Sequence, residues 1–474
     1  MDVLEDFLQK LQICTRTDHK QQPQKLLDLL QLNPQKNPFI VRINNLGYLG
    51  VSQVSYSVEK RNWFNGEWLA FDNLVISFVK LCNQMNPWSL LESFDLYTTY
   101  LNDITVAFMN KTRGYLVTPL LKEVLNQVLT MAKQLDYQML SKEMYRKPRL
   151  AFMASILLKA FNNIRSQLGA EDHIEATKKS IMLFIGVKLC QTYFLLSNPL
   201  RCQDVFSNMN NANLIFGSYP PNQQLQYRYY LARFYMAKYE FLDAFEHLRW
   251  CLSHVPINYT IDSPNVTKIL RDILPISILL GKRPKFGNFL RIYYSAPLKC
   301  PKFFAMYSDL ASAIKTGNFS KLHDLINSSG NAEFLKQNGF ASFFSSKAYL
   351  ITLRNLVKSI WVTQGKKMRL EYDAVKSGLL LSLQNLDLTT VVMISSNSGY
   401  EYPMDRPLDD HAVENCLVTL IDQNFLRGKL FPRLRVVSLA KSEVFPDIPS
   451  TYFSKFGNGE EGILNSKDRW IGQN

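Results

Sequence analysis

Four basic residues near the C-terminal end of the chain are spaced so that they can bind phosphate. Arg427, Lys429, Arg433 and Arg435 alternate with apolar residues on either side of Pro432. Alternation with a period of two predicts a short hairpin with its apolar side chains inward and its basic side chains outward. Cations on a protruding hairpin are placed to contact phosphate oxygens. Basic residues also keep an exposed edge strand soluble, so the pattern alone leaves both roles open.

Positive charge is concentrated in the C-terminal half of the chain. The formal net charge is +14, yet without the 18 basic residues of three acid-free runs, 281–302, 334–370 and 423–441, the remaining 36 basic residues face 40 acidic ones. Local charge of one sign is what a polyanion-binding face requires, although each run is also compatible with a solvated surface. The further candidates for nucleic-acid contact are Lys366, Lys367, Arg369, Arg354, Lys358, Lys282, Arg283 and Lys285. The last three flank a turn, where an acidic partner is as suitable as RNA.

Residue types used in catalysis are scattered rather than grouped. The sequence has no G-x-x-x-x-G-K-S phosphate loop, no G-x-S-x-G motif and no H-x-H of the kind that metal-dependent isopeptidases use. Glu171, Asp172, His173 and Glu175 lie together, but at the start of a predicted helix they suit the helix dipole better than a metal. The seven cysteines form no C-x-x-C pair, which indicates reduced thiols. We expect no enzyme activity, no metal and no cofactor.

The basic hairpin must be held by the elements that precede it. Two amphipathic helices are predicted within residues 345–384, followed by a turn-rich insertion at 389–408. A third helix is predicted to begin at the N-cap Asp409 and to end at Asn424, which tolerates a left-handed conformation. Three helices followed by a two-stranded wing form a winged helix, a module that either binds a nucleic-acid groove or packs side by side with other winged helices.

The rest of the chain is predicted to be a helical array. Segments of helical periodicity separated by Asn-Pro and Gly turns run from residue 61 to 330. Within 227–256, Ala232 and Ala244 are small residues placed where two helices of a tetratricopeptide-like hairpin would cross. The expected fold is all-α, a right-handed stack of such hairpins followed by a winged helix with a short β-hairpin. The predicted divisions are an N-terminal region (1–60), the array (61–330), the winged-helix part (331–445) and a tail (446–474). No window approaches eighteen consecutive apolar residues, so no membrane-spanning segment is expected.

Five segments in this order resemble the PCI-domain family. They are RYYLARFYMAKYEFLDAF, ILPISILLGKRP, LASAIKTGNFSKL, LRNLVKSIW and VENCLVTLIDQNFLRGKLF. The segment NPWSLLESFDLY further resembles the nuclear mRNA-export branch, the Thp-type PCI subunit of the TREX-2 transcription-export complex. The resemblance covers about residues 80–441, and Asn424 stands where many relatives carry glycine.

This resemblance implies a scaffold or adaptor subunit rather than an enzyme. Such subunits pair their winged helix with that of a larger GANP-like PCI scaffold protein and bind a small acidic stabilising subunit. They act in the nucleus, at the nuclear envelope and nuclear pores, and they contact pore components indirectly. The joined winged helices serve as a platform for RNA or DNA. The alternative is a PCI subunit of a signalosome-like complex that acts only in protein assembly.

Overall fold

The computed structural model describes residues 2–16, 21–144, 146–167, 173–212, 214–383, 408–456 and 466–472. In the helix His173–Leu195, the backbone is described from His173 and the side chains from residue 178 onward. The acidic cluster at 171–175 and the insertion at 389–407 therefore lie outside the described side chains. The chain forms two compact units, Met1–Ala237 with Ser466–Asn474, and Lys238–Asn465. The boundaries at residues 60, 330 and 445 stay a prediction.

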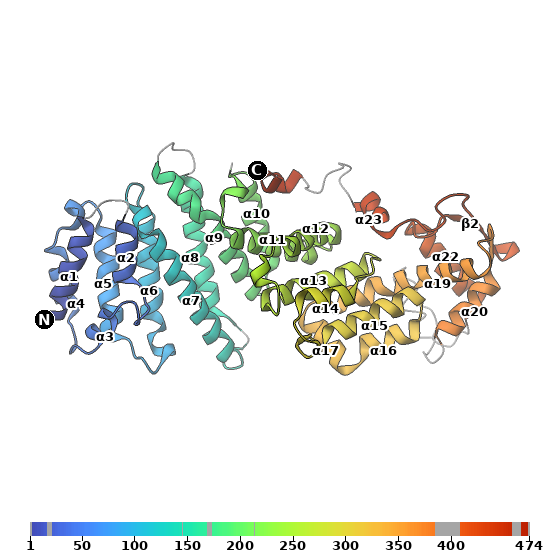
Figure 1. The fold of residues 1–474 in the computed structure, drawn as a ribbon, viewed down its shortest axis with the longest axis horizontal. Helices are drawn as coiled ribbons and strands as arrows, with labels where there is room; N and C mark the ends of the chain where they lie inside the picture. The colour runs from blue at the N-terminus through green and yellow to red at the C-terminus, as the bar shows by residue number, and fades with distance from the viewer. Residues whose placement is uncertain are drawn as a thin grey trace. The chain divides into compact units, whose positions relative to one another are not determined.

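The first unit consists of helices that pack against their neighbours along the chain (Figure 1, blue to green). Its elements are α1 (Asp2–Thr15), α2 (Gln22–Leu30), α3 (Phe39–Asn44), α4 (Val51–Glu59), η1 (Trp63–Gly66), α5 (Leu69–Gln84), α6 (Leu90–Phe108), η2 (Gly114–Val117), α7 (Thr118–Gln138), α8 (Pro148–Ser166), α9 (His173–Leu195), η3 (Pro199–Arg201), α10 (Cys202–Asn210), η4 (Phe216–Ser218), α11 (Pro221–Ala237) and η9 (Ser466–Gly472).

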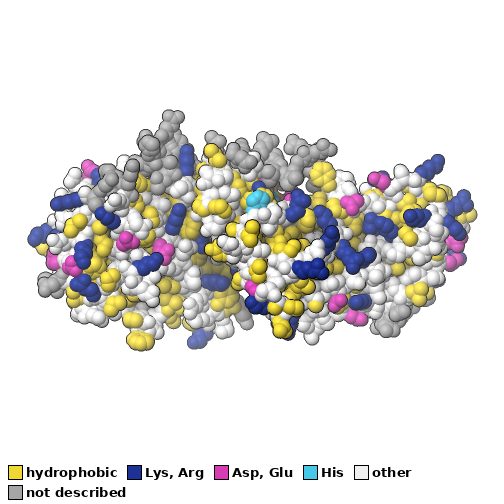
Figure 2. Space-filling view, in the orientation of Figure 1, with side chains coloured by type: hydrophobic (Ala, Val, Ile, Leu, Met, Phe, Trp, Pro, Cys, Tyr) yellow, Lys and Arg dark blue, Asp and Glu magenta, His cyan; other side chains and the backbone are white. Residues whose placement is uncertain are grey.

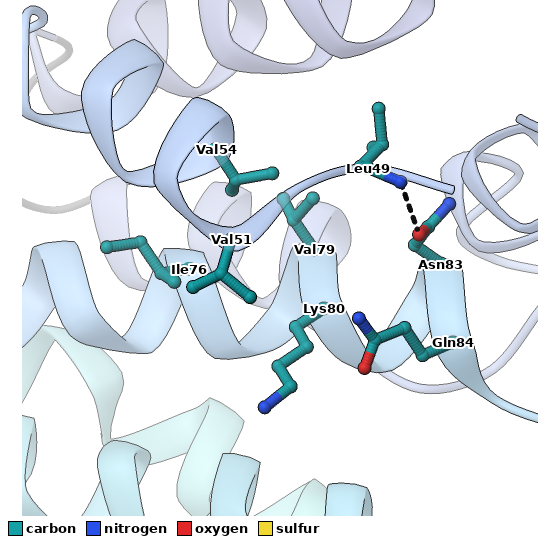
Figure 3. Close-up of a pocket in the computed structure, with 8 residues that line it drawn as sticks. All are labelled: Leu49, Val51, Val54, Ile76, Val79, Lys80, Asn83 and Gln84. Carbon is teal, nitrogen blue, oxygen red and sulfur yellow. Dashed lines mark hydrogen bonds between the residues drawn. The ribbon is translucent and has the colours of Figure 1, made fainter. Parts of the chain in front are cut away.

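Residues 1–60 share their core with the helices that follow. Phe7 of α1 is fully buried, and its ring centroid lies 5.4 Å from that of Phe39 and 5.5 Å from that of Phe78 in α5. Asn83 of α5 accepts a hydrogen bond from the Leu49 amide at 3.1 Å (Figure 3). The hollow drawn there has a volume of about 10 Å³, which is room for about one water molecule and not for a cofactor.

The C-terminal residues 466–472 belong to the core of this first unit. Trp470 is buried, and its ring makes edge-on contacts with Phe216 and Tyr227, whose ring centroids lie 5.0 and 5.1 Å away. The indole N–H of Trp470 donates to the Tyr227 hydroxyl at 3.3 Å. Three aromatic residues of α11 contribute to the same core, since Tyr227, Phe234 and Tyr235 are all buried.

The second unit contains the winged helix (Figure 1, green to red). Its elements are α12 (Phe241–Ser253), η5 (Ile257–Tyr259), α13 (Pro264–Leu279), α14 (Phe286–Tyr293), η6 (Pro297–Lys299), α15 (Phe303–Thr316), α16 (Phe319–Asn327), α17 (Ser329–Gln337), α18 (Ala341–Phe343), η7 (Phe344–Ala348), α19 (Tyr349–Thr363), β1 (Arg369–Glu371), α20 (Tyr372–Leu383), α22 (Asp410–Asp422), β2 (Gly428–Phe431), η8 (Pro432–Leu434), β3 (Val436–Leu439) and α23 (Ile448–Phe456). The predicted fold class, helical hairpins that end in a winged helix, is confirmed. The two predicted crossing alanines are both buried, Ala232 in α11 and Ala244 in α12.

The wing has three strands where the sequence predicted two. β1 precedes α20 and pairs with β3, so the sheet order is β1-β3-β2 and both pairings are antiparallel. Residues 369–371 form this strand inside the range 345–384, where the sequence predicted only helices. The helix begins only at Tyr372, whose amide donates to the Arg435 carbonyl at 3.0 Å.

The third helix has the predicted ends. The Asp409 side chain accepts a hydrogen bond from the Ala412 amide at 2.8 Å, so it is the N-cap of α22. Asn424 has φ of 58°, the left-handed conformation expected of it. The apolar face between them is buried at Val413, Leu417 and Leu420.

A glycine turn lets α15 approach α19 closely. Gly317 ends α15 with φ of 74°, and Asn318 caps α16 by accepting from the Lys321 amide. A Cβ atom at Gly317 would lie 2.7 Å from the Cα atom of Leu356 in α19. Glycine is therefore required here both by the backbone conformation and by the packing.

Gly317→Ala should destabilise the second unit by roughly 2–5 kcal/mol, the sum of a left-handed conformation and an overpacked contact. Gly339→Ala is the matched control, because Gly339 has φ of 76° but no atom within 4 Å of its Cβ position. The control should lose only about 1–2 kcal/mol. Urea unfolding of both variants measures the difference, and equal losses would show that the contact with Leu356 relaxes freely.

Candidate nucleic-acid interface

The register of the wing sheet places two basic residues on the same face. Arg369 of β1 and Lys429 of β2 are both paired with Ser438 of the central strand β3. Residues directly opposite one another in adjacent strands lie on the same face, and strands are about 4.8 Å apart. The Cα atoms of Arg369 and Lys429 are therefore about 10 Å apart, on either side of Ser438. We call Arg369, Ser438 and Lys429 the basic row.

The opposite face of the sheet is apolar and anchors the wing. In the next register position, Val437 of the central strand is paired with Leu370 on one side and with Leu430 on the other. Leu370 and Val437 are fully buried. The alternation predicted from the sequence therefore holds through the strands, with apolar side chains inward and the basic row outward.

The cations of the basic row are free of ion pairs within the described part of the chain. Arg369 and Lys429 are exposed, and so is Arg433 in the turn η8 between β2 and β3. None of the three has a carboxylate within 4.0 Å among the described residues. A phosphate group would therefore meet uncompensated charge at these positions.

Phe431 lies on the same face as the basic row and was missed by the sequence reasoning. It is two residues after Lys429 in β2, and its side chain is 44% exposed. It is paired with Val436, which is in turn paired with Glu371 of β1. The signal was present in the sequence, because the alternation that points Lys429 outward also points Phe431 outward.

Arg435 ties the wing to two helices, which is a different role from the one predicted. Its guanidinium donates to Asp373 of α20 at 2.7 Å and to Asp410 of α22 at 2.8 Å. The hydrogen bond to Asp410, followed by the charges of both aspartates, raises the pKa of Arg435. Asp373 and Asp410 already neutralise the charge of Arg435 inside the fold. Arg435 is therefore not part of the proposed binding surface.

Arg427 is likewise paired within the fold. Its guanidinium lies 2.7 Å from the carboxylate of Glu443, and its amide donates to the Val444 carbonyl at 2.8 Å. Its carbonyl accepts from the Ala440 amide at 2.9 Å. Arg427 therefore closes the base of the wing, and a phosphate would have to compete with Glu443 for its side chain.

Arg354 is not on the surface, so the predicted nucleic-acid contact of Arg354 is wrong. The Arg354 side chain is buried in α19 and donates to the carbonyl of Pro446 at 2.8 Å. Desolvation by burial lowers the pKa of Arg354. Lys358, one turn later, is exposed, and its pKa is lowered by partial burial and by the neighbouring Arg354 charge.

The linker before β1 holds two exposed cations next to the sheet. Lys366 has φ of 58°, and its amide donates to the Trp361 carbonyl at 2.9 Å. The Trp361 indole in turn donates to the Lys367 carbonyl at 2.9 Å. These bonds fix the linker backbone, and the side chains of Lys366 and Lys367 face solvent.

The remaining predicted cations lie in a different part of the second unit. Lys282, Arg283 and Lys285 are exposed in the connection from α13 to α14. Figure 1 shows this connection separated from β2, and α13 packs against α12 and α15 rather than against the sheet. Lys282 lies 3.9 Å above the ring centroid of Phe245 in α12, a cation–π contact. In Figure 2, dark blue side chains gather on the second unit, and others lie at the end of that unit that carries the wing.

A groove of about 600 Å³ adjoins this second basic region. Its walls are α14, η6 and the start of α15, and its apolar lining includes Leu290, Tyr294 and Phe304. Arg291 and Lys302 are the charged residues of the lining, and no acidic residue is among the described residues that line it. The groove therefore combines an apolar floor with positive charge.

Within the described part of the chain, no group of His, Cys, Asp and Glu is arranged to hold a metal ion. The seven cysteines are all free thiols. No helix among the described residues combines the length and the apolar character needed to cross a bilayer.

Helical hairpins that lead into a winged helix resemble the architecture of PCI-domain proteins. Comparison with known proteins supports this resemblance. No protein-family model matches the chain. It is similar to the nuclear mRNA export protein THP1 of Saccharomyces cerevisiae, with 25% identity over 80% of this chain and 82% of that protein. It is also similar to PCI domain-containing protein 2 of Xenopus laevis, with 22% identity over 70% of this chain and 78% of that protein. A third relative is the protein CSN12 homolog of Mycosarcoma maydis, with 24% identity over 75% of each chain.

The resemblance to the PCI-domain family, and within it to the mRNA-export branch, is confirmed.

Arg435→Ala should loosen the wing, because Asp373 and Asp410 would then repel each other without a cation between them. We expect a lower melting temperature at low ionic strength and a smaller difference at high salt, where exposed charges are screened. Arg433→Ala, two residues away and unpaired within the described chain, is the control and should leave the melting temperature unchanged. Equal effects of the two substitutions would contradict the tether.

Proposed function

We propose that this chain is a non-enzymatic adaptor subunit of a nuclear mRNA-export complex of the TREX-2 type, acting at nuclear pores. Similarity to an export protein over four fifths of the chain supports the process. The basic row supports a direct role for the winged helix in holding RNA or DNA. Its cations reach the surface on one face, and the arginines that the fold neutralises, Arg427 and Arg435, instead hold the wing in place.

Solubility of the sheet edges is the competing explanation for these cations. β1 and β2 are the two edges of the sheet, and lysine or arginine at an edge discourages pairing with other chains. Edge protection does not require the two cations to share one face, nor a further unpaired arginine in the turn between β2 and β3. Phosphate binding benefits from both features, because several cations then contact one backbone.

We further propose that the winged helix pairs with that of a larger, GANP-like PCI scaffold. Leu380 and Leu381 of α20 are 54% and 70% exposed, and Val418 of α22 is 45% exposed. Exposed apolar side chains on the helices, away from the basic row, fit a protein contact.

The small acidic subunit is proposed to bind the groove beside α14. The groove has no acidic lining residue in the described chain and carries Arg291 and Lys302, with Lys282, Arg283 and Lys285 in the adjoining connection. An acidic segment with apolar side chains matches both its charge and its floor.

Lys429→Ala combined with Arg433→Ala should weaken RNA binding and flatten its salt dependence. The logarithm of affinity for single strands changes by about 0.7 per phosphate contact per decade of salt, so the slope should shrink by about 1.4. Fluorescence anisotropy with a labelled oligouridine across a salt series measures this. Arg283→Ala combined with Lys285→Ala is the control, because it removes the same charge from an exposed region away from the wing. An unchanged slope in the double variant would reject the outer face of the wing as the binding surface and favour the assembly-only alternative, in line with the similarity to a CSN12 homolog.

Arg291→Glu combined with Lys302→Glu should reduce recovery of the small acidic subunit in co-purification while leaving RNA affinity unchanged. The charge reversal removes the complementarity of the groove without touching the wing. The wing double variant serves as the reciprocal control, and it should retain the acidic subunit. Loss of the acidic subunit from the wing variant alone would place that partner on the winged helix instead.

A further inference from the structure

Phe431 is an aromatic side chain held at the surface between two unpaired cations. Lys429 precedes it by two residues on the same face of β2, and Arg433 follows it by two residues in the turn. Two residues of an extended strand span roughly 7 Å. The Lys429 side chain is therefore the neighbour of the Phe431 ring on the same face of the strand. Leu434, at the tip of the turn, is 70% exposed. The end of the wing therefore presents an apolar surface next to the basic residues Lys429 and Arg433.

The backbone of the wing fixes this position. Phe431 is paired with Val436 of the central strand, and the half-buried Val436 side chain lies beside it on the outer face. The inward neighbour Leu430 lies opposite the buried Val437. A one-residue slip that buried Phe431 would bring the basic row into the core, so the register keeps the ring exposed.

We propose that Phe431 stacks on an unpaired base, so that the wing binds single-stranded nucleic acid in preference to duplex. This inference rests on the proposed role of the basic row in phosphate binding. Bases in a duplex are already stacked on one another, whereas every base of a single strand offers a free face to an aromatic ring. Cations on both sides of the ring receive the phosphates that flank such a base.

The charge around Phe431 favours a nucleic acid over an apolar protein surface as the occupant. A protein that buried the ring would also have to desolvate Lys429 and Arg433, which is unfavourable unless each meets a carboxylate. A phosphate backbone supplies an anion at every nucleotide and needs no such matching. Glu371, two strands away in the same row as Phe431, is the one acidic residue among the described residues on the outer face of the strands. It lies at the far edge, on β1, where a base rather than a phosphate is the compatible neighbour.

The test compares Phe431→Ala in the full-length chain with oligouridine RNA and with the oligouridine–oligoadenine duplex of the same length. Affinity for the single strand should fall roughly 5- to 100-fold, the usual range for losing one base–aromatic stack. Affinity for the duplex should be unchanged, and so should the salt slope for both probes, because no phosphate contact is removed. Phe431→Trp should restore single-strand affinity and add a tryptophan whose fluorescence is quenched by RNA. Leu434→Ala removes a neighbouring exposed apolar residue that has no ring and should bind like the parent.

Each outcome separates the stacking role from its alternatives. If Phe431→Ala weakens both probes equally and Leu434→Ala does the same, the tip acts as general apolar surface and stacking is wrong. If Phe431→Ala leaves RNA affinity intact but prevents co-purification with a partner protein, the ring belongs to a protein interface and the proposal is overturned. The alanine variants of Lys429 and Arg433 report separately on the proposed function. If they flatten the salt slope while Phe431→Ala has no effect, phosphate binding stands and only stacking fails.

Discussion

The antiparallel register of three short strands is the constraint on which the proposed function depends. Because Arg369 and Lys429 are both paired with Ser438, two cations that are 60 positions apart in sequence share one face about 10 Å apart. A shift of one residue in either pairing would turn one of these side chains toward the core. The buried Leu370 and Val437 oppose such a shift, since it would expose them. Burial of a few aliphatic side chains on one face thus determines where the positive charge lies on the other.

The basic residues of the C-terminal half are divided among distinct tasks. Arg435 and Arg427 neutralise carboxylates that lie on the helices and at the base of the wing, and Arg354 is buried against backbone carbonyls of the segment after the wing. Among the other predicted cations in the described part of the chain, one exposed group lies on or next to the wing and another lies beside α14. A positively charged chain therefore need not bind one polyanion over one continuous face. We propose that RNA binds the wing surface and that an acidic protein segment binds the surface beside α14.

Local features of the second unit were predictable because each depends on neighbouring residues. The Asp409 cap, the left-handed Asn424 and the glycine turn at Gly317 follow from backbone preferences within a few positions. β1 was missed because three residues are too few to show alternation, and it forms only through pairing with β3. The ion pairs of Arg435 and the burial of Arg354 were also missed, since their partners lie 25 to 92 positions away and become neighbours only in the folded chain. The spacing in the sequence predicted which basic side chains point outward from a strand. Tertiary contacts decide which of these side chains are left without an ion pair.

Photocrosslinking of the full-length chain to a 4-thiouridine-containing single-stranded RNA, with the crosslinked peptides identified by mass spectrometry, tests the central claim most directly. If the outer face of the wing holds nucleic acid, the adducts will map to residues 366–371 and 428–439, with Phe431 among the modified positions. Adducts confined to the connection between α13 and α14, or to the first unit, would contradict a nucleic-acid interface on the wing.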